Sequence, residues 1–303
     1  MFNLYRNITV LFVLAIFLNI HAVENVSSVN AYQSGKEIVI TYELFQKSDV
    51  IVYVSTDGGK KYHTLQNISG DFGKDVEPGN KQIYWDVLSQ YDKFIFSEVC
   101  FKIESIINNG HEYVDLDLPS GTLWATCNVG ASKPEEYGYY FAWGENSPKS
   151  KYNWETYKWS QGTAYTMTKY CTLSSYGKVD NKKTLEPIDD AASVNWGGNW
   201  RMPTKKELDE LCLKCTWEWT TFNGVNGYKV TSKTNGNSIF LPAAGYRNNS
   251  SLSANGSYGF YWSSSLRMKY LFYSYILAIE SNYMNSDEYD IRSYGLSVRA
   301  VLH

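Results

Sequence analysis

Residues 195–212 read NWGGNWRMPTKKELDELC and contain the clearest helix start in the chain. Pro203 fixes the backbone φ angle just before Thr204, whose hydroxyl is suited to accept a hydrogen bond from an unpaired amide of the first turn. Glu207 follows three residues later and completes the pattern of a capping box. Leu208 then starts an apolar side among charged neighbours. These features predict a short amphipathic helix that begins at Thr204.

The residues before this helix predict a structural frame rather than the floor of an active site. The glycines at 197–198 allow a turn that other residues resist, and we expect Trp196 and Trp200 to cover the base of the helix. Arg201 is expected to hold loop carbonyls or a carboxylate rather than a substrate. A second, shorter helix is predicted around residues 189–195, DDAASVN.

The composition predicts two domains and argues against a nucleic-acid partner. The chain has 303 residues, 44% of them hydrophobic and 19% charged, which is enough apolar material for two cores. Its net charge is −3, whereas binding to phosphates needs a concentrated basic face. Aromatic residues make up 16%, with 26 Tyr and 10 Trp, a share that is typical of β-rich folds or of surfaces that recognise ligands.

Residues 1–22 have the pattern of a signal peptide. The stretch contains one arginine, then a mostly apolar run of thirteen residues at 8–20, and then the small residue Ala22. The apolar run is too short to span a bilayer comfortably. We expect cleavage near Ala22 and export to the periplasm, the cell surface or the medium; an uncleaved anchor is the alternative. No cysteine follows for a lipid anchor, and no later stretch is expected to cross a membrane.

Export makes disulfides possible, but the five cysteines leave at least one unpaired within the chain. Cys100 lies in an alternating apolar stretch and is expected to be buried. Cys212 and Cys215 form a C-x-x-C pair without the second pair that a zinc site needs. The pairing among Cys127, Cys171, Cys212 and Cys215 stays open.

Residues 23–107 predict an immunoglobulin-like β-sandwich that serves as a spacer. Short alternating strands are separated by turn signals such as TDGG at residues 56–59 and VEPGNK at residues 76–81. No cluster of His, Asp or Cys suggests chemistry in this part. The polar stretch IINNGHEY at residues 106–113 marks the domain boundary. The predicted strands occupy residues 36–44, 49–55, 60–65, 81–87 and 94–105.

Residues 108–303 are rich in Trp, Tyr, Gly and Asn and predict short strands between long irregular loops. The fold class is therefore mainly β, with an α+β C-terminal domain after the N-terminal β-sandwich. The clearest strand-like stretches are residues 238–247, 259–267 and 296–303.

Six blocks of this domain occur in an order that resembles a known family. They run from HEYVDLDLPSGTLWATCNVGA at residues 111–131 to GLSVRAV at residues 295–301, with EEYGYYFAWGE, DDAASVNWGGNWRMPTKKELDEL, GNSIFLPAAGYR and GFYWSSSL between them. Together they resemble the major paralogous domain family first named from Fibrobacter succinogenes, which is common in exported proteins of gut Bacteroidetes. That family is similar to the formylglycine-generating-enzyme branch of the C-type lectin-like fold. The resemblance implies a C-type lectin-like domain over residues 108–303.

The residues that the related enzymes need for catalysis do not recur here. Those enzymes use a late pair of cysteines, whereas this chain has no cysteine after Cys215. Its histidines lie in the signal peptide, the sandwich, the boundary and the last position, so a histidine relay or zinc hydrolase is not expected. A carboxylate pair that cleaves glycosides stays open as an alternative. The four histidines are His21, His63, His111 and His303.

The acidic stretch at residues 179–190 predicts a calcium site. Calcium takes six to eight oxygen ligands, and lectin-like folds often fix long loops with it. The stretch lacks the EF-hand spacing and the Glu-Pro-Asn triplet of sugar-binding C-type lectins, and Lys182 and Lys183 partly neutralise it. The alternative is that Asp189 and Asp190 cap the short helix that follows. The candidate ligands are Asp180, Asn181, Glu186, Asp189 and Asp190.

The late aromatic stretches predict a ligand-binding surface. Exposed rings and polar tips are suited to stack on and hydrogen-bond with a glycan or a protein, although strand alternation buries about half of such rings. The candidate residues are Tyr246, Arg247, Tyr258, Tyr261, Tyr283 and Tyr289.

Taken together, these features predict an exported, non-catalytic binding or adhesion protein at a bacterial surface, with a glycan or a surface protein as its partner. Two alternatives stay open. The chain is either a structural or adaptor component of a surface assembly such as a fimbria tip, or an enzyme of unknown type.

Overall fold

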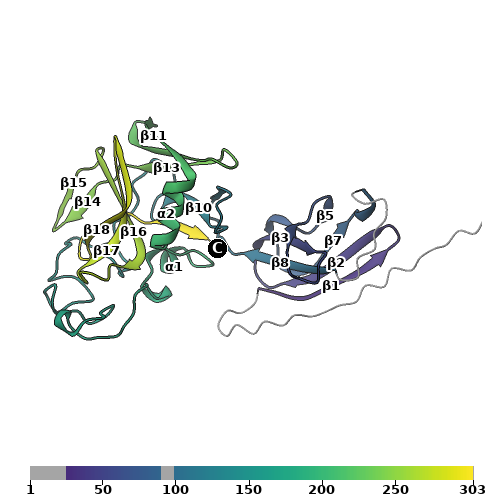
Figure 1. Ribbon diagram of the computed structural model, residues 1–303, viewed down its shortest axis with the longest axis horizontal. Helices are drawn as coiled ribbons and strands as arrows, with labels where there is room; N and C mark the ends of the chain where they lie inside the picture. Colours follow the sequence, from purple (N-terminus) through teal and green to yellow (C-terminus); the bar gives the residue numbers. More distant parts are fainter. Residues whose placement is uncertain (1–24, 90–98, 303) are drawn as a thin grey trace, which may run out of the picture. The chain divides into compact units, whose positions relative to one another are not determined.

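The computed structural model describes residues 25–89 and 99–302. The chain divides into two compact units between Ile107 and Asn108, and each is described here by itself. The fold is mainly β, built from several small antiparallel sheets with two α-helices (Figure 1). The predicted signal peptide, residues 1–22, lies outside the described residues. Among the residues that are described, no helix has the length and apolar character needed to cross a membrane.

The N-terminal unit consists of two antiparallel sheets. One has the strand order β1-β2-β7-β5, and in the other β3 pairs with β8 along one edge and with β4 and β6 along the opposite edge. The elements are β1 (Val26–Ser34), β2 (Glu37–Leu44), β3 (Ser48–Ser55), β4 (His63–Thr64), β5 (Ile68–Gly70), β6 (Gly73–Val76), β7 (Gly79–Trp85), the 3-10 turn η1 (Val87–Ser89) and β8 (Cys100–Ile106).

Both sheets of this unit contribute to one hydrophobic core. Ile40 of β2 and Val52 of β3 are buried in the same cluster, and Trp85 of β7 contacts Phe101 of β8 edge to face at 5.9 Å. This shared core is the arrangement that the alternating sequence predicts, since each strand buries one side. The strand expected at residues 60–65 is reduced to His63–Thr64, because this polar stretch is mostly exposed and has little apolar surface to bury. Cys100, expected to be buried, is partly exposed.

The C-terminal unit contains four small sheets and two α-helices. The strand orders are β19-β10-β9, β11-β12-β13, β14-β15 and β16-β17-β18. The elements are β9 (Tyr113–Asp115), β10 (Leu123–Asn128), the 3-10 turns η2 (Ser174–Tyr176) and η3 (Pro187–Asp189), α1 (Ala191–Trp196), α2 (Lys205–Lys214), β11 (Cys215–Phe222), β12 (Val225–Ser232), β13 (Ser238–Pro242), β14 (Tyr246–Asn248), β15 (Ser251–Ser253), β16 (Tyr258–Leu266), β17 (Tyr273–Glu280), β18 (Tyr283–Ile291) and β19 (Arg299–Leu302).

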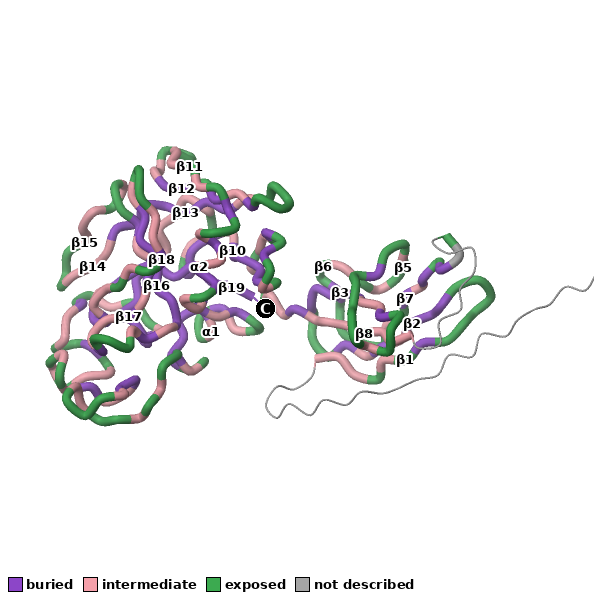
Figure 2. Tube along the Cα trace, in the orientation of Figure 1, coloured by how far each residue is buried: buried purple, intermediate pink, exposed green. Residues whose placement is uncertain are grey.

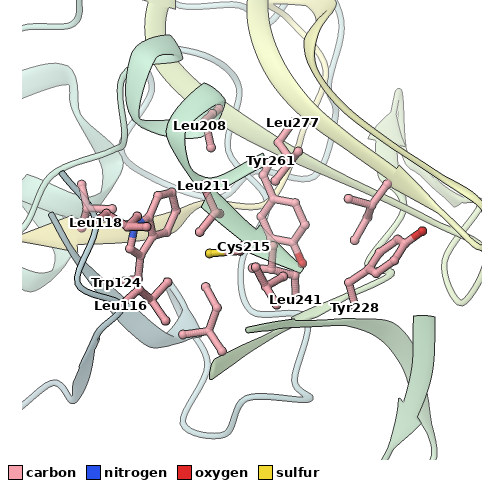
Figure 3. Packing of buried hydrophobic residues seen from close by; sticks show 14 residues of the cluster. Leu116, Leu118, Trp124, Leu208, Leu211, Cys215, Tyr228, Leu241, Tyr261 and Leu277 are labelled. Atoms are coloured by element: carbon pink, nitrogen blue, oxygen red, sulfur yellow. The ribbon is translucent and has the colours of Figure 1, made fainter. Parts of the chain in front are cut away.

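Helix α2 joins these sheets through its apolar side. Leu208 and Leu211 pack into a cluster with Trp124 of β10, Tyr261 of β16 and Leu277 of β17 (Figure 3). The core therefore draws on the first and the last parts of the unit, and β10 pairs directly with β19. By contrast, the long segment between β10 and α1 contains no long strand and is largely exposed or half-buried (Figure 2).

The predicted capping box at the start of α2 is confirmed. Thr204 Oγ1 accepts from the Glu207 amide, and the Thr204 amide donates to Glu207 Oε2 at 2.7 Å. Arg201 also donates to Glu207 Oε2, at 2.8 Å, as expected for a residue that holds a carboxylate. Burial opposes the charge of Glu207 most strongly, but these hydrogen bonds outweigh burial and lower its pKa to about 2.

The two tryptophans of the opening stretch, which we expected to cover the base of α2, contact the first residues of the C-terminal unit. Trp196 stacks on His111 with ring centroids 4.0 Å apart, and Trp200 Nε1 donates to the carbonyl of Asn108. They therefore hold the first residues of the C-terminal unit. Trp196 is the last residue of α1, and its ring meets that of Trp200 edge to face at 4.9 Å.

Candidate functional site

The acidic stretch is held by ion pairs and by hydrogen bonds to backbone amides, and these partners occupy the carboxylates that were predicted to bind calcium. Asp180 accepts hydrogen bonds from the amides of Tyr170, Cys171 and Lys182, so its carboxylate closes a loop. Asn181 adopts a left-handed backbone conformation with φ 59° beside it. Because the Asp180 oxygens face backbone amides, they are already occupied as acceptors.

The ammonium groups of lysines lie beside the other carboxylates, where a metal cation would have to bind. Glu186 forms ion pairs with Lys169 and Lys182, and these hydrogen bonds, that with Lys169 first, lower its pKa to about 2. Asp189 is buried and pairs with Lys169 at 2.5 Å, while the hydroxyl of Tyr170 donates to it at 2.7 Å. The stretch is therefore held by ion pairs.

Asp190 has a separate role as the N-cap of α1, which confirms for Asp190, but not for Asp189, the alternative that the sequence left open. Its Oδ1 accepts from the amides of Ala192 and Ser193, and its Oδ2 accepts from the amide of Met202. Glu186 and Asp189 thus share Lys169, whereas Asp180 and Asp190 each bind backbone amides of their own. Over residues 25–89 and 99–302 no group of three or more His, Cys, Asp or Glu side chains is placed to hold a metal ion.

The five cysteines are free thiols in this structure, and the surroundings of Cys212 and Cys215 disfavour the thiolate. Burial raises the pKa of Cys215 to about 11 and also raises that of Cys212. A thiol is reactive mainly as the thiolate, which these surroundings disfavour.

The structure separates the six predicted ligand-binding residues. Tyr261 is 1% exposed and its hydroxyl donates to the carbonyl of Pro242, so the prediction that it contacts a ligand is wrong. Its strand β16 turns this ring into the core beside α2. Tyr283 is exposed but lies at the start of β18, where its hydroxyl donates to Glu288. Arg247 lies over the ring of Tyr140, with 5.1 Å between the guanidinium carbon and the ring centroid.

Tyr246 and Tyr258 belong to one aromatic group, which we call the hairpin-side cluster. The Tyr246 ring stacks on Tyr294 with centroids 5.8 Å apart and meets Phe260 edge to face at 5.7 Å. Tyr258 stacks on Phe260 with an interplanar angle of 2°. The hairpin-side cluster comprises Tyr246, Tyr258, Phe260 and Tyr294.

Backbone pairing explains why these rings meet. The amide of Arg247 donates to the carbonyl of Gly295, and the amide of Gly295 donates back to Arg247, which docks the β14–β15 hairpin on the segment after β18. A side chain at Gly295 would place its Cβ 2.6 Å from the Tyr152 ring, so this close approach requires glycine.

Tyr289 belongs to a second aromatic group, the loop-side cluster. Its ring lies 4.8 Å from that of Tyr273, which lies 4.4 Å from Phe272. Phe272 in turn contacts Tyr270 and Tyr176, both at 6.0 Å. The loop-side cluster comprises Tyr165, Tyr176, Tyr270, Phe272, Tyr273 and Tyr289.

Several rings of the loop-side cluster face solvent. Tyr165 is 61% exposed, Tyr270 41% and Tyr289 38%, although large aromatic side chains tend to be buried. The guanidinium of Arg267 lies 3.6 Å from the Tyr289 centroid, a cation–π contact, and its Nη1 is buried without a hydrogen-bond partner among the described residues. The cluster is thus a surface of ring faces and edges, with Arg267 beside Tyr289 and Tyr270 and with Lys269 over Tyr270.

The long segment between β10 and α1 supplies Tyr165 and Tyr176, which the sequence analysis did not single out, and the loop between β16 and β17 supplies Tyr270 and Phe272. The Met167 amide donates to the Tyr176 carbonyl, and the loop closes at Gly177, where a Cβ would lie 2.2 Å from the Met167 carbonyl oxygen. This closure stacks Tyr165 on Tyr176 at 5.5 Å. In the sequence, Gly177 within a polar loop was the only local sign of this loop closure.

Arg292 fixes these loops against one another. It is fully buried, and its guanidinium donates to the carbonyls of Lys169, Tyr170 and Leu271 and to the hydroxyl of Tyr157. Those carbonyls flank the segments that carry Tyr165 and Phe272, so one side chain sets the spacing of both loops. A planar guanidinium with five donors is suited to this role.

One family model matches part of the chain. A family model described as "Domain of unknown function (DUF8237)" matches residues 219–301, which extend from β11 to β19. The match includes the hairpin-side cluster and four of the six rings of the loop-side cluster. Searches of curated proteins and of solved structures returned no significant match.

Proposed function

We propose that the chain is an exported, non-catalytic binding protein whose C-terminal unit recognises a glycan at a bacterial surface. The observation that carries the proposal is the pair of aromatic clusters on one unit, with Tyr165, Tyr258, Tyr270 and Tyr289 all exposed. Flat rings pack well on the C–H faces of sugars, while their hydroxyls, together with Arg267, supply hydrogen bonds to sugar oxygens.

The remaining parts of the proposal rest on sequence. The pattern of residues 1–22 supports export, and the six ordered blocks support a C-type lectin-like fold for residues 108–303 behind an immunoglobulin-like spacer. The pairing of β10 with β19 and the position of α2 beside the small sheets are compatible with that fold. The raised pKa of the buried thiols supports a binding role rather than catalysis.

The test is binding of the chain that starts at Val23 to a panel of immobilised polysaccharides and mucins. We expect binding to at least one glycan and a loss of about tenfold in affinity when Tyr165 and Tyr270 are both changed to Ala, since about 1.4 kcal/mol corresponds to a factor of ten. Tyr32→Ala removes an exposed tyrosine of the N-terminal unit and is the matched control, expected to bind normally.

Two results would contradict this proposal. Normal glycan binding by the double variant would place the binding surface elsewhere. If the folded protein binds nothing on the panel, the proposal fails, and the alternative of a component of a surface assembly becomes the leading one. Mild crosslinking followed by identification of co-purified partners would then test that alternative.

A further inference from the structure

Arg267 directly follows β16 and lies against two rings of the loop-side cluster. Its guanidinium carbon is 3.6 Å from the centroid of the Tyr289 ring and 5.4 Å from that of the Tyr270 ring. Its backbone amide donates to the carbonyl of Tyr273, which ties the base of the side chain to β17. A guanidinium that rings already hold in place loses little further freedom when it binds a ligand.

The guanidinium of Arg267 has hydrogen-bond donors that the described part of the chain does not use. Its Nη1 is buried without a partner. Its Nε and Nη2 also make no hydrogen bond to any described residue, but they are not buried, so the edge that carries them is the part that an external group can reach. Two parallel N–H donors on one edge of a guanidinium match the two oxygens of a carboxylate.

The charge of Arg267 is not neutralised by an ion pair within residues 25–89 and 99–302. The same holds for Lys269, which is exposed two residues further on and whose ammonium lies 5.5 Å from the centroid of the Tyr270 ring. Two positive charges therefore lie beside the exposed rings of this cluster. Unpaired cations at a surface attract anionic ligands.

The acids of the neighbouring strand β18 have other positions or partners. Glu288 and Asp290 flank Tyr289 along the strand, so they project to the opposite face of the sheet from the ring that holds Arg267. Asp287 forms an ion pair with Lys205 at 3.2 Å. The face that carries Tyr289 is thus left with an arginine that has no acidic partner on this strand.

The rings and the guanidinium edge together favour a sugar that carries a carboxylate. Tyr165 and Tyr270 are exposed, and their rings can pack on the C–H face of a pyranose. In a uronic acid the carboxyl group is attached directly to the pyranose ring, so one sugar presents both features side by side. A neutral sugar would use the rings but would leave the charge of Arg267 without a partner.

We propose that Arg267, held by Tyr289 and Tyr270, binds the carboxylate of a uronic acid within the glycan that the loop-side cluster recognises. This inference rests on the proposed function, because the rings supply the stacking faces for the sugar, and it narrows the glycan to acidic polysaccharides. A glutamate side chain of a peptide offers the same carboxylate without a pyranose ring, so it is the competing source of that group.

The test measures binding to three polyuronates, alginate, polygalacturonate and hyaluronan, and to the same polymers after their carboxyl groups have been reduced to alcohols. Reduction keeps the pyranose ring and the linkage but removes the charge. We expect the wild-type protein to bind at least one polyuronate about tenfold more tightly than its reduced form, the effect of a charge-assisted hydrogen-bonded pair.

Two variants of Arg267 test the role of its guanidinium. Arg267→Gln removes the charge, so it should bind the polyuronate and its reduced form equally. Arg267→Lys keeps the charge but not the paired donors, so it should lose most of the preference; a full preference in this variant would overturn the paired hydrogen bonds to the carboxylate.

Lys229→Gln is the matched control. Lys229 is exposed on β12, in a different sheet of the same unit, and it forms no ion pair with any residue that the structure describes. Its change removes the same positive charge and should keep the preference for the polyuronate. Thermal unfolding of each variant shows that it is folded before binding is compared.

The outcomes separate this inference from the proposed function. The carboxylate site is wrong, while glycan binding stands, if the wild-type protein binds a neutral glycan but no polyuronate, if it binds each polyuronate and its reduced form equally, or if Arg267→Gln keeps the preference. If the folded protein binds no glycan at all, both fail. A tetraglutamate peptide forms the third arm: if it binds more tightly than every polyuronate and depends on Arg267, the assignment to an acidic sugar is overturned.

Discussion

Asp290 carries a charge that its surroundings disfavour, and this has a consequence for stability. Its pKa is raised from 3.8 to about 6 in the folded state, so protonation favours folding. The stabilisation is complete below about pH 4 and is lost as the pH rises through about 6. At neutral pH the ionised carboxylate therefore destabilises the fold.

We predict that Asp290→Asn stabilises the protein by about 1–2 kcal/mol at neutral pH, less than the full pKa shift implies because the residue is partly exposed. Urea unfolding of both proteins at neutral pH and near pH 4 measures this, and the difference should shrink toward zero at the lower pH. A variant that is less stable than the wild type at neutral pH would show that Asp290 has a stabilising partner.

At the scale of elements, Arg292 connects the loops that carry the loop-side cluster. Arg292→Met removes the donors of three carbonyls and one hydroxyl that lie in the interior. We predict a loss of more than about 3 kcal/mol in the free energy of unfolding, because each orphaned buried acceptor costs about 1–3 kcal/mol. Urea unfolding gives the loss, and limited proteolysis should show new cleavage between residues 157 and 176.

Arg247→Met is the control for this prediction. Arg247 lies over the Tyr140 ring and is only half-buried, so its loss should cost less than about 1 kcal/mol. If the two variants lose equal amounts of unfolding free energy, Arg292 does not hold the loops together.

The acidic stretch before α1 predicts no dependence on calcium. Its carboxylates are occupied by Lys169, Lys182 and backbone amides, and a ligand that does not bind the folded state does not change its stability. We expect the midpoint of thermal unfolding in calcium and in EDTA to agree within about 1 °C. A rise of several degrees in calcium would restore the metal site that the sequence suggested.

The sequence predicted the local features of these elements but not the contacts between them. The capping box at Thr204 and the N-cap at Asp190 were predictable because both depend on residues within one turn. The direction of Tyr261 was not, since alternation shows that half of the rings are buried but only the pairing of β16 with β17 decides which half. Likewise, the contact of Tyr176 with Phe272 joins loops far apart in sequence, and no local pattern encodes it.

At the scale of the whole molecule, the two units have separate cores. The buried cluster of the N-terminal unit and that of the C-terminal unit each consist of that unit's own residues. We predict that residues 108–303 fold alone and keep the glycan binding of the chain, because a core that size is self-sufficient. Circular dichroism and the binding panel test this; a fragment that is unfolded, or folded but inactive, would mean that the N-terminal unit contributes more than spacing.

The central claim is that the exposed rings of the two clusters bind a glycan, and β18 offers a matched pair of residues that tests it. Tyr289 is 38% exposed and lies in the loop-side cluster, while Tyr283 is 39% exposed on the same strand but outside both clusters. Removing either ring changes the exposed surface by a similar amount.

The decisive measurement is the affinity of Tyr289→Ala and of Tyr283→Ala for the glycan that binds most tightly on the panel. We predict that Tyr289→Ala weakens binding about tenfold and that Tyr283→Ala changes it by less than about twofold, since only the first removes a stacking face of the cluster. Equal effects, or a larger effect of Tyr283→Ala, would contradict the assignment of the binding surface to these clusters.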